Sequence, residues 1–258
     1  MTALRIPDLA GRAVLVTGAA TGIGAAVARA FALQGVHIGL HYHTSRAPAE
    51  ALHREIVNAG GTAFLLQGDV AQSGESERLV EQAAARLCRL DGLINNAGTM
   101  LGRVALESCD DAHFARVIDL NARSVLAATR AAVPHLRAAG GGFIINTSSI
   151  SARSGGSNGG AIYAAAKGFV STLTHGAAKE FAGDNIRVNA VAPGVIDTAF
   201  HERYSTPQML QAQARTIPLR RLGTAEECVG AFLFLASPML SGFVTGQVIE
   251  VNGGQLMP

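Results

Sequence analysis

Short runs rich in valine, isoleucine and leucine alternate with longer helix-forming segments along most of this chain. This rhythm is typical of repeated βαβ units, in which parallel strands form one sheet and helices cover both of its faces. The sequence therefore predicts an α/β fold with a doubly wound parallel sheet of seven strands. The expected strands are residues 13–17, 36–42, 63–67, 92–95, 142–147, 186–191 and 247–251.

The composition suits one well-buried domain spanning residues 1–258, because 48% of the residues are hydrophobic and only 16% are charged. A formal charge of +2, with basic residues scattered along the chain, disfavours nucleic acid as a partner. No apolar stretch approaches the roughly 20 residues of a transmembrane helix, and residues 1–9 lack the apolar core of a secretory signal. We therefore expect a cytoplasmic protein without a membrane partner.

No metal site is expected. The three cysteines, Cys88, Cys109 and Cys228, are far apart and include no Cys-x-x-Cys pair, which disfavours both disulfides and zinc. His41 and His43 share one face of an expected strand, as two metal ligands could. No cysteine or carboxylate at suitable spacing completes a coordination shell, so ordinary polar contacts are the favoured interpretation.

A glycine-rich turn follows the first expected strand. The segment TGAATGIG, residues 17–24, leads into a helix-forming stretch. Gly18, Gly22 and Gly24 lack a Cβ, so backbone amides and a helix N-terminus could close on a pyrophosphate. No Gly-Lys-Ser/Thr follows, which argues against a P-loop, and the spacing differs from the common Gly-x-Gly-x-x-Gly. This segment alone is compatible with dinucleotide binding and with a purely structural tight turn.

Tyr163 and Lys167 are four residues apart in the segment YAAAK, which places them on one face of a helix. A neighbouring ammonium stabilises phenolate over phenol, so we expect the pKa of Tyr163 to fall from about 10 towards the working range of a general acid or base. An alanine-rich helix could also carry this pair for packing and solubility alone. The surrounding motifs favour the catalytic interpretation.

Small and polar residues gather where the expected strands end. In doubly wound sheets, ligands bind beyond the carboxyl ends of the strands. The sequence therefore predicts one ligand site at that edge of the sheet. It would be formed by residues 18–24, Asp69, residues 95–98, residues 148–149 and residues 193–194.

Seven motifs occur in a distinctive order. They are TGAATGIG (17–24), Asp69 in QGDV, NNAG (95–98), Asn121 in DLNARS, Ser149 in INTSSIS, YAAAK (163–167) and PGVIDT (193–198). Over almost its whole length the chain thus resembles a short-chain dehydrogenase/reductase, with a pattern similar to the 3-oxoacyl-acyl-carrier-protein reductase branch. The resemblance implies a single Rossmann-like domain that transfers hydride between a nicotinamide dinucleotide and a carbonyl or secondary alcohol.

The resemblance also implies a catalytic set of Asn121, Ser149, Tyr163 and Lys167. Tyr163 would give or take the proton, and Lys167 would bias its pKa and bind the nicotinamide ribose. Ser149 would donate a hydrogen bond to the carbonyl oxygen, on which negative charge develops. Asn121 would hold a water next to the lysine.

Which serine acts is a separate question, because Ser148, Ser149 and Ser151 lie close together and alternate strand residues face opposite ways. Ser149 is the second serine of the family's pattern and is the predicted residue, with Ser148 as the alternative. Ser149 precedes Tyr163 by one residue more than in many relatives. We expect the extra residue in the glycine-rich loop of residues 152–160, which could flex over the substrate.

The end of the second expected strand bears on the choice of cofactor. NAD-specific proteins normally place Asp or Glu there, against the ribose 2′-hydroxyl. This chain instead has His43, Thr44, Ser45 and Arg46, which offer donors and a positive charge for a 2′-phosphate. The segment is similar to that of NADP-dependent members, including pteridine reductases. NADP(H) is therefore favoured, with NAD(H) possible.

Further cofactor contacts are implied by the resemblance. Asp69 would contact adenine, although it could instead cap a following helix, and Asn95 could support packing rather than the cofactor. The Ile196 backbone and the Thr198 hydroxyl would hold the nicotinamide carboxamide. The expected cofactor-binding residues are Gly18, Thr21, Gly22, Ile23, Gly24, His43, Thr44, Ser45, Arg46, Asp69, Val70, Asn95, Ala97, Gly98, Tyr163, Lys167, Pro193, Gly194, Ile196 and Thr198.

Substrate choice is expected to depend on a lid of about residues 199–219, which contains no diagnostic motif. The resemblance favours an acyl-carrier-bound 3-oxoacyl thioester or a related small ketone, with sugars, diketones, steroids and pteridines as alternative classes. A dinucleotide-binding sensor or scaffold is the alternative function, although the complete catalytic set favours an enzyme. Helices near residues 111–138 and 161–182 are expected from the family to form a homodimer or homotetramer interface.

Overall fold

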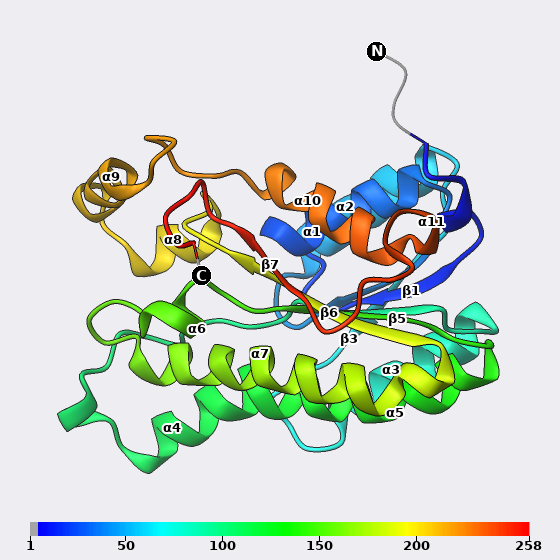
Figure 1. The fold of residues 1–258 in the computed structure, drawn as a ribbon, viewed down its shortest axis with the longest axis horizontal. Coiled ribbons are helices and arrows are strands. Elements are labelled where there is room, and N and C mark those ends of the chain that lie inside the picture. The colour runs from blue at the N-terminus through cyan, green and yellow to red at the C-terminus, as the bar shows by residue number, and fades with distance from the viewer. Residues whose placement is uncertain (1–4, 258) are drawn as a thin grey trace.

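The computed structural model describes residues 5–257, apart from the side chains of His201 and Glu202. Seven strands form one parallel sheet in the order β3-β2-β1-β4-β5-β6-β7 (Figure 1). This confirms the predicted fold class, and each expected strand appears within two residues of its predicted ends. The strands are β1 (Ala13–Val16), β2 (His37–Tyr42), β3 (Ala63–Gln67), β4 (Gly92–Asn95), β5 (Gly142–Thr147), β6 (Ile186–Pro193) and β7 (Val248–Val251).

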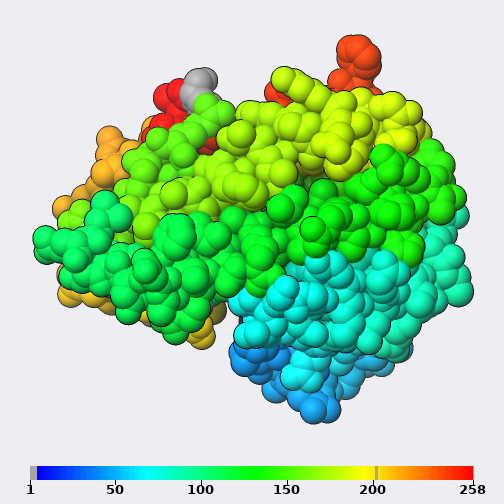
Figure 2. Space-filling model, turned by 90° about the horizontal axis from the view of Figure 1, so that it is seen from below, coloured from blue at the N-terminus to red at the C-terminus, as the bar shows by residue number. Residues whose placement is uncertain are grey.

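Helices cover both faces of the sheet. On one face lie α1 (Gly22–Leu33), α2 (Arg46–Asn58), α10 (Ala225–Ala236) and α11 (Pro238–Ser241) (Figure 1). The opposite face carries α3 (Glu75–Leu87), α5 (Ser124–Ala138) and α7 (Ala161–Phe181), and Figure 2 shows green α5 and yellow-green α7 side by side there. The remaining helical segments are η1 (Pro7–Leu9), η2 (Leu106–Ser108), α4 (Asp111–Ile118), η3 (Asp119–Arg123), α6 (Ser151–Ser154), η4 (Ala182–Asp184), α8 (Ala199–Tyr204) and α9 (Pro207–Thr216).

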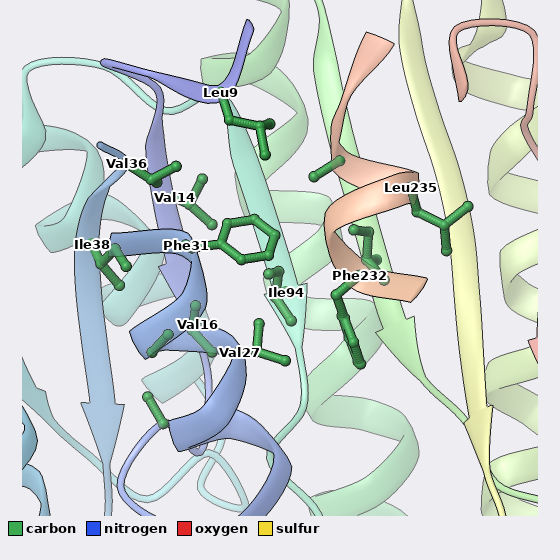
Figure 3. Packing of buried hydrophobic residues seen from close by; sticks show 14 of the residues in the cluster. Leu9, Val14, Val16, Val27, Phe31, Val36, Ile38, Ile94, Phe232 and Leu235 are labelled. Carbon is green, nitrogen blue, oxygen red and sulfur yellow. The ribbon is translucent and has the colours of Figure 1, made fainter. Parts of the chain in front are cut away.

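Each face of the sheet has its own hydrophobic core, because successive residues of a strand point to opposite sides. Val14 and Val16 pack with α1 and α10, whereas Leu15 between them packs with α3, α5 and α7. Figure 3 shows Phe31 of α1 and Phe232 of α10 pointing into the same layer, and both side chains are fully buried. Burial on both faces explains why the strands are continuous apolar runs.

The strand order reverses between β1 and β4, which is where doubly wound sheets bind ligands. At the amino end of this pair, the buried carboxylate of Asp91 accepts a hydrogen bond from the Ala13 amide (2.8 Å). The same carboxylate pairs with Arg12 (3.2 Å) and Arg89 (2.6 Å). These contacts fix β1 beside β4 and leave their carboxyl ends to open the cleft.

Three segments differ from the expectation. The helix expected near residues 111–138 is interrupted by a π turn, η3, between α4 and α5. The segment expected to form a lid contains two helices, α8 and α9, because Pro207 begins a new helix whose N-cap Thr206 accepts a hydrogen bond from Met209 N. The loop of residues 152–160 begins as the short helix α6. Within residues 5–257, no helix is both long and apolar enough to cross a bilayer.

Candidate active site

A cleft of about 650 Å³ lies at the carboxyl ends of β1, β4, β5 and β6. It brings together most of the residues that the sequence singled out, from four separate βα connections. Predicted residues in its wall are Gly18, Thr21, Gly22, Ile23, Ala97, Gly98, Ser149, Tyr163, Lys167, Pro193, Gly194, Ile196 and Thr198. The cleft also places the start of α8 opposite the glycine turn.

The glycine turn requires its glycines for steric reasons. Gly18 has φ +64°, and a Cβ on Gly24 would lie only 2.2 Å from the Gly18 carbonyl oxygen. Gly22 has φ +55°, and a Cβ there would meet Thr198 at 3.5 Å across the cleft. Thr21, the N-cap of α1, makes no side-chain cap hydrogen bond, so the first amides of α1 remain available. This cradle fits a dinucleotide pyrophosphate.

Two side chains outside the predicted set hold this turn from behind. The Gly18 amide donates to His41 Nδ1 (3.0 Å), and His41 Nε2 donates to the Gly68 carbonyl (3.1 Å). Asn96 Nδ2 donates to the carbonyl oxygens of Thr17 (3.1 Å) and Gly18 (3.0 Å). Burial lowers the pKa of His41 to about 4, so the imidazole is neutral at neutral pH.

Tyr163 and Lys167 lie on the first turns of α7. Lys167 is buried, and its Nζ lies 5.8 Å from the centre of the Tyr163 ring and donates to the Thr147 carbonyl (2.8 Å). Tyr163 is partly accessible from the cleft, and its hydroxyl hydrogen-bonds Ser149. The phenol ring contacts Phe200 of α8, with 5.8 Å between the ring centres. Two predicted catalytic side chains, Ser149 and Tyr163, are therefore in direct contact.

The expected fall in the pKa of Tyr163 is wrong for this structure. Burial raises the pKa of Tyr163 to about 12, and the hydrogen bond with Ser149 lowers it only in part. Burial lowers the pKa of Lys167 to about 8, because the ammonium has lost its hydration. The ammonium binds the Thr147 carbonyl rather than the phenol. In this state Tyr163 is a neutral proton donor at neutral pH.

The neighbouring serines have different surroundings. Ser148 is buried, and its hydroxyl contacts the Lys167 carbonyl (3.2 Å) and the Ser171 hydroxyl (2.7 Å), which ties β5 to α7. Ser149 Oγ faces Tyr163 and accepts a hydrogen bond from the Ser151 amide (3.1 Å). This geometry favours Ser149 as the residue that meets a substrate.

Asn121 sits inside the π turn η3 and is fully buried. Its Nδ2 donates to the carbonyl oxygens of Thr99 and Val117, both at 2.9 Å. Its Oδ1 has no partner among the described residues. A Cβ on Gly98 would lie 2.6 Å from this oxygen and 3.2 Å from Lys167 Nζ, so the two polar atoms face one small space. Such a space suits a bridging water, and π turns often occur at functional sites.

The segment after β2 lies apart from the cleft wall. His43 Nε2 is 4.0 Å from Asp69 Oδ2, and Arg46 pairs with Glu50 (2.7 Å) along the exposed side of α2. Ser45, the N-cap of α2, makes no side-chain cap hydrogen bond, and Thr44 precedes it. The donors expected for a 2′-phosphate therefore lie outside the wall of this cleft, and one of them, Arg46, already pairs with a carboxylate.

Asp69 and Asn95 make local structural contacts. Asp69 Oδ1 accepts from the Ala71 amide (3.0 Å), and the next helix begins only at Glu75, so Asp69 closes a turn rather than capping a helix. Val70 beside it is buried. Asn95 Nδ2 donates to Asn146 Oδ1 (2.9 Å) and Thr129 Oγ1 (3.3 Å) inside the sheet. The Asn95 side chain therefore supports packing, as the alternative interpretation of this residue expected.

The segment after β6 forms the wall opposite the glycine turn. A Cβ on Gly194 would lie 2.7 Å from the Asn252 Cβ, so the chain passes too close to the C-terminal segment for a side chain. Thr198 Oγ1 donates to the Ile196 carbonyl (3.3 Å). Ile196 and Thr198 both line the cleft on this side.

Sequence reasoning missed three residues that shape the site. Asn96 is the second asparagine of NNAG, and its position beside the glycine turn could have been read from the motif. For His41 the sequence pattern favoured ordinary polar contacts over metal binding, but it did not predict the contact with the Gly18 amide. No metal-binding cluster occurs among residues 5–257 as far as they are described. Arg103, which lines the cleft, belongs to no motif and could not have been found without the fold.

Known proteins are similar to this chain in sequence and fold. The family model described as enoyl-(acyl carrier protein) reductase, from the short-chain dehydrogenases/reductases, matches residues 18–255. The chain therefore belongs to the short-chain dehydrogenase/reductase family. A 3-oxoacyl-[acyl-carrier-protein] reductase from Synechocystis sp. is 38% identical over 253 residues, covering 96% of this chain and 98% of that protein.

Solved structures agree with this assignment. The NADH-dependent reductase A1-R′, responsible for alginate metabolism, is 41% identical, with a TM-score of 0.90 over 98% of this chain and 100% of that chain. The same reductase has been solved with NAD. A short-chain dehydrogenase from Burkholderia cenocepacia J2315 in complex with NADP is 29% identical, with a TM-score of 0.89 over 96% of this chain and 99% of that chain.

We predict that His41 makes the fold acid-sensitive. Its pKa is about 4 in the folded protein and about 6.5 in an unfolded chain, so the unfolded chain binds a proton first as the pH falls. This contribution to stability is complete above pH about 6.5 and is lost as the pH falls to about 4, with a slope of up to about 1.4 kcal/mol per pH unit. Urea unfolding at several pH values measures it.

The variant His41→Phe should show a smaller slope over this pH range, and its affinity for a dinucleotide should fall because the Gly18 amide loses its acceptor. His37→Phe, an exposed position on the same strand, is the matched control. Equal slopes for the wild type and His41→Phe would contradict the assignment.

Proposed function

We propose that this protein is an NADP(H)-dependent carbonyl reductase, which transfers hydride between nicotinamide and a carbonyl or secondary alcohol. The observation that carries the proposal is the convergence of Ser149, Tyr163, Lys167 and Asn121 around one cleft that also contains the glycine turn. A sensor or scaffold would bind a dinucleotide without needing the Ser149–Tyr163 contact or the buried lysine. The enzyme is therefore the better supported function.

The residues divide the chemistry in a definite way. A nicotinamide held between the glycine turn and Thr198 would supply or accept the hydride. Ser149 orients the carbonyl oxygen, and Tyr163, neutral at neutral pH, donates its proton to that oxygen as negative charge develops there. Lys167 binds ribose hydroxyls and, with Asn121 Oδ1, holds the water that returns a proton to Tyr163.

The substrate is proposed to be a 3-oxoacyl thioester or a related ketone. The relative from Synechocystis is named for 3-oxoacyl groups on acyl-carrier protein, and a second relative, A1-R′, is a reductase responsible for alginate metabolism. Both names describe reductases, and the first names a 3-oxoacyl substrate. Carbonyl reduction is the chemistry that we propose for this chain, and the substrate end of the cleft would then select the carbonyl compound.

NADP(H) is proposed as the preferred cofactor. Residues 43–46, directly after β2, include no carboxylate, and Ser45 leaves the N-terminus of α2 without a side-chain cap, which suits an anion. Arg46 would leave its ion pair with Glu50 and bind the 2′-phosphate instead. The A1-R′ relative is named as NADH-dependent, and the Burkholderia structure holds NADP, so the family contains both choices.

We also propose that the protein forms a homodimer or homotetramer through the face made by α4, α5 and α7 (Figure 2). Large apolar side chains are exposed on each of these helices: Phe114 (48%), Leu126 (41%) and Phe169 (42%). Exposed apolar patches of this kind mark interaction surfaces. Sedimentation velocity should give a dimer or tetramer for the wild type and a smaller species for Phe169→Glu. A wild-type monomer would contradict the proposal.

Tyr163→Phe should lower kcat about 10²- to 10⁴-fold, because the ring remains but the proton donor is lost. The Kd for NADPH, measured by fluorescence, should change little. Tyr42→Phe provides a matched control, since the Tyr42 hydroxyl contacts only Gln67 at 3.5 Å. Unchanged turnover in Tyr163→Phe would refute the catalytic assignment. Tight NADPH binding by the wild type without turnover of any ketone would support the sensor.

Arg46→Gln should lower the ratio of kcat/KM for NADPH to that for NADH by about tenfold or more, because a charge-assisted hydrogen bond to the 2′-phosphate is lost. Arg54→Gln, which removes an exposed arginine of the same helix, should leave the ratio unchanged. A wild type that prefers NADH would contradict the cofactor proposal directly.

A further inference from the structure

Arg103 stands in the wall of the cleft, in the segment between β4 and η2. Its Nε donates to the Tyr204 carbonyl (2.7 Å), and its Nη1 donates to Ser157 Oγ (2.6 Å) and the Asn158 carbonyl (3.0 Å). Every one of these acceptors is neutral. The guanidinium is thus fixed between the end of α8 and the loop before α7, with its charge unpaired among the described residues.

Among the described residues that line the cleft, no Asp or Glu balances Arg103, and the only charged side chains are Arg103 and Lys167. Lys167 is buried at the ribose end and donates to the Thr147 carbonyl. Nη2 of Arg103 donates to no described residue, whereas a guanidinium can bind a carboxylate through two nitrogens. A partly buried arginine of this kind favours an anionic ligand.

The position of Arg103 relative to Tyr163 indicates which end of a substrate it meets. Tyr163 contacts Phe200, and Phe200 contacts Tyr204 with 5.1 Å between the ring centres. Tyr204 in turn accepts the hydrogen bond from Arg103. The guanidinium is therefore linked to the reacting phenol through the Tyr204 backbone and Phe200, and not by a direct hydrogen bond among the described residues. An anion bound there would be several carbon atoms from a carbonyl that contacts Tyr163.

We propose that Arg103 binds a carboxylate of the substrate, so that the enzyme prefers keto acids whose carboxylate lies several carbons from the carbonyl. This inference rests on the proposed carbonyl reductase and specifies its substrate class. The same guanidinium binds the end of α8 and the loop before α7. A bound carboxylate would therefore also stabilise the positions of these two segments.

Paired substrates test this proposal. The keto acids 4-oxopentanoate and 5-oxohexanoate differ from their methyl esters in the charge at the far end and by one methyl group. An acetoacetyl thioester of N-acetylcysteamine represents neutral acyl substrates. We expect kcat/KM of the wild type to be higher for an acid than for its ester by about tenfold or more, as a charge-assisted hydrogen bond provides. The readout is the ratio of kcat/KM for the acid to kcat/KM for the ester, because general damage to the fold lowers both values alike.

Arg103→Gln should bring this ratio close to one, and Arg103→Lys should retain part of it, since lysine keeps the charge but not the planar fork. Arg153→Gln is the matched control: Arg153 is an exposed arginine beside the cleft whose charge is paired with Glu250 at 3.5 Å, so its ratio should equal that of the wild type.

An acid-to-ester ratio near one in the wild type, or a ratio that Arg103→Gln leaves intact, would overturn the proposal. Turnover of the thioester alone would overturn it while leaving the carbonyl reductase in place. Absence of turnover on acids, esters and thioester would contradict the reductase itself. In that case ligand-observed NMR with pentanoate and NADP⁺ decides the inference: binding by the wild type that Arg103→Gln abolishes supports it, and no binding refutes it.

Discussion

The glycine turn after β1 keeps its shape because its polar backbone atoms are bonded on the protein side. His41 accepts from the Gly18 amide and Asn96 donates to the Gly18 carbonyl, so these groups are satisfied away from the cleft. Gly24 completes the arrangement, since any side chain would collide with the Gly18 carbonyl. The uncapped first amides of α1 are then the free donors that face the cleft. Anion binding needs no cation here.

The opposite side of the cleft depends on buried polar atoms in a different way. Lys167 has lost its hydration and lies beside the unpartnered oxygen of Asn121, next to Gly98. Burying such groups without partners costs free energy, and folds retain them where a ligand or water completes the contacts. The π turn at Asn121 makes this possible, because it turns the amide inward while α4 and α5 continue the same helical path. Desolvation and an unpartnered polar atom are thus found together where proton transfer is proposed.

The fold was largely predictable from the sequence, and the site less so. Parallel strands buried on both faces leave continuous apolar runs such as residues 13–16, and each run was found. Local motifs located Tyr163 and Lys167 because helical spacing alone puts them on one face. The roles of His41 and Arg103 depend on contacts with residues more than twenty positions away, which no local pattern encodes. Likewise, the direction of the pKa shift of Tyr163 depends on burial, which only packing reveals.

The distribution of charge in the cleft bears on how one site could bind both the cofactor and the substrate. The chain has a formal charge of only +2, so no long-range field concentrates anions, and each anionic group must be met locally. In the proposed function, backbone amides would meet the pyrophosphate, Lys167 the ribose and Arg103 the substrate. Because none of the described lining residues is Asp or Glu, no carboxylate of the wall competes with an anionic ligand for these positive groups. Burial raises the pKa of Tyr163 to about 12, so the phenol stays protonated at neutral pH and can act as a proton donor.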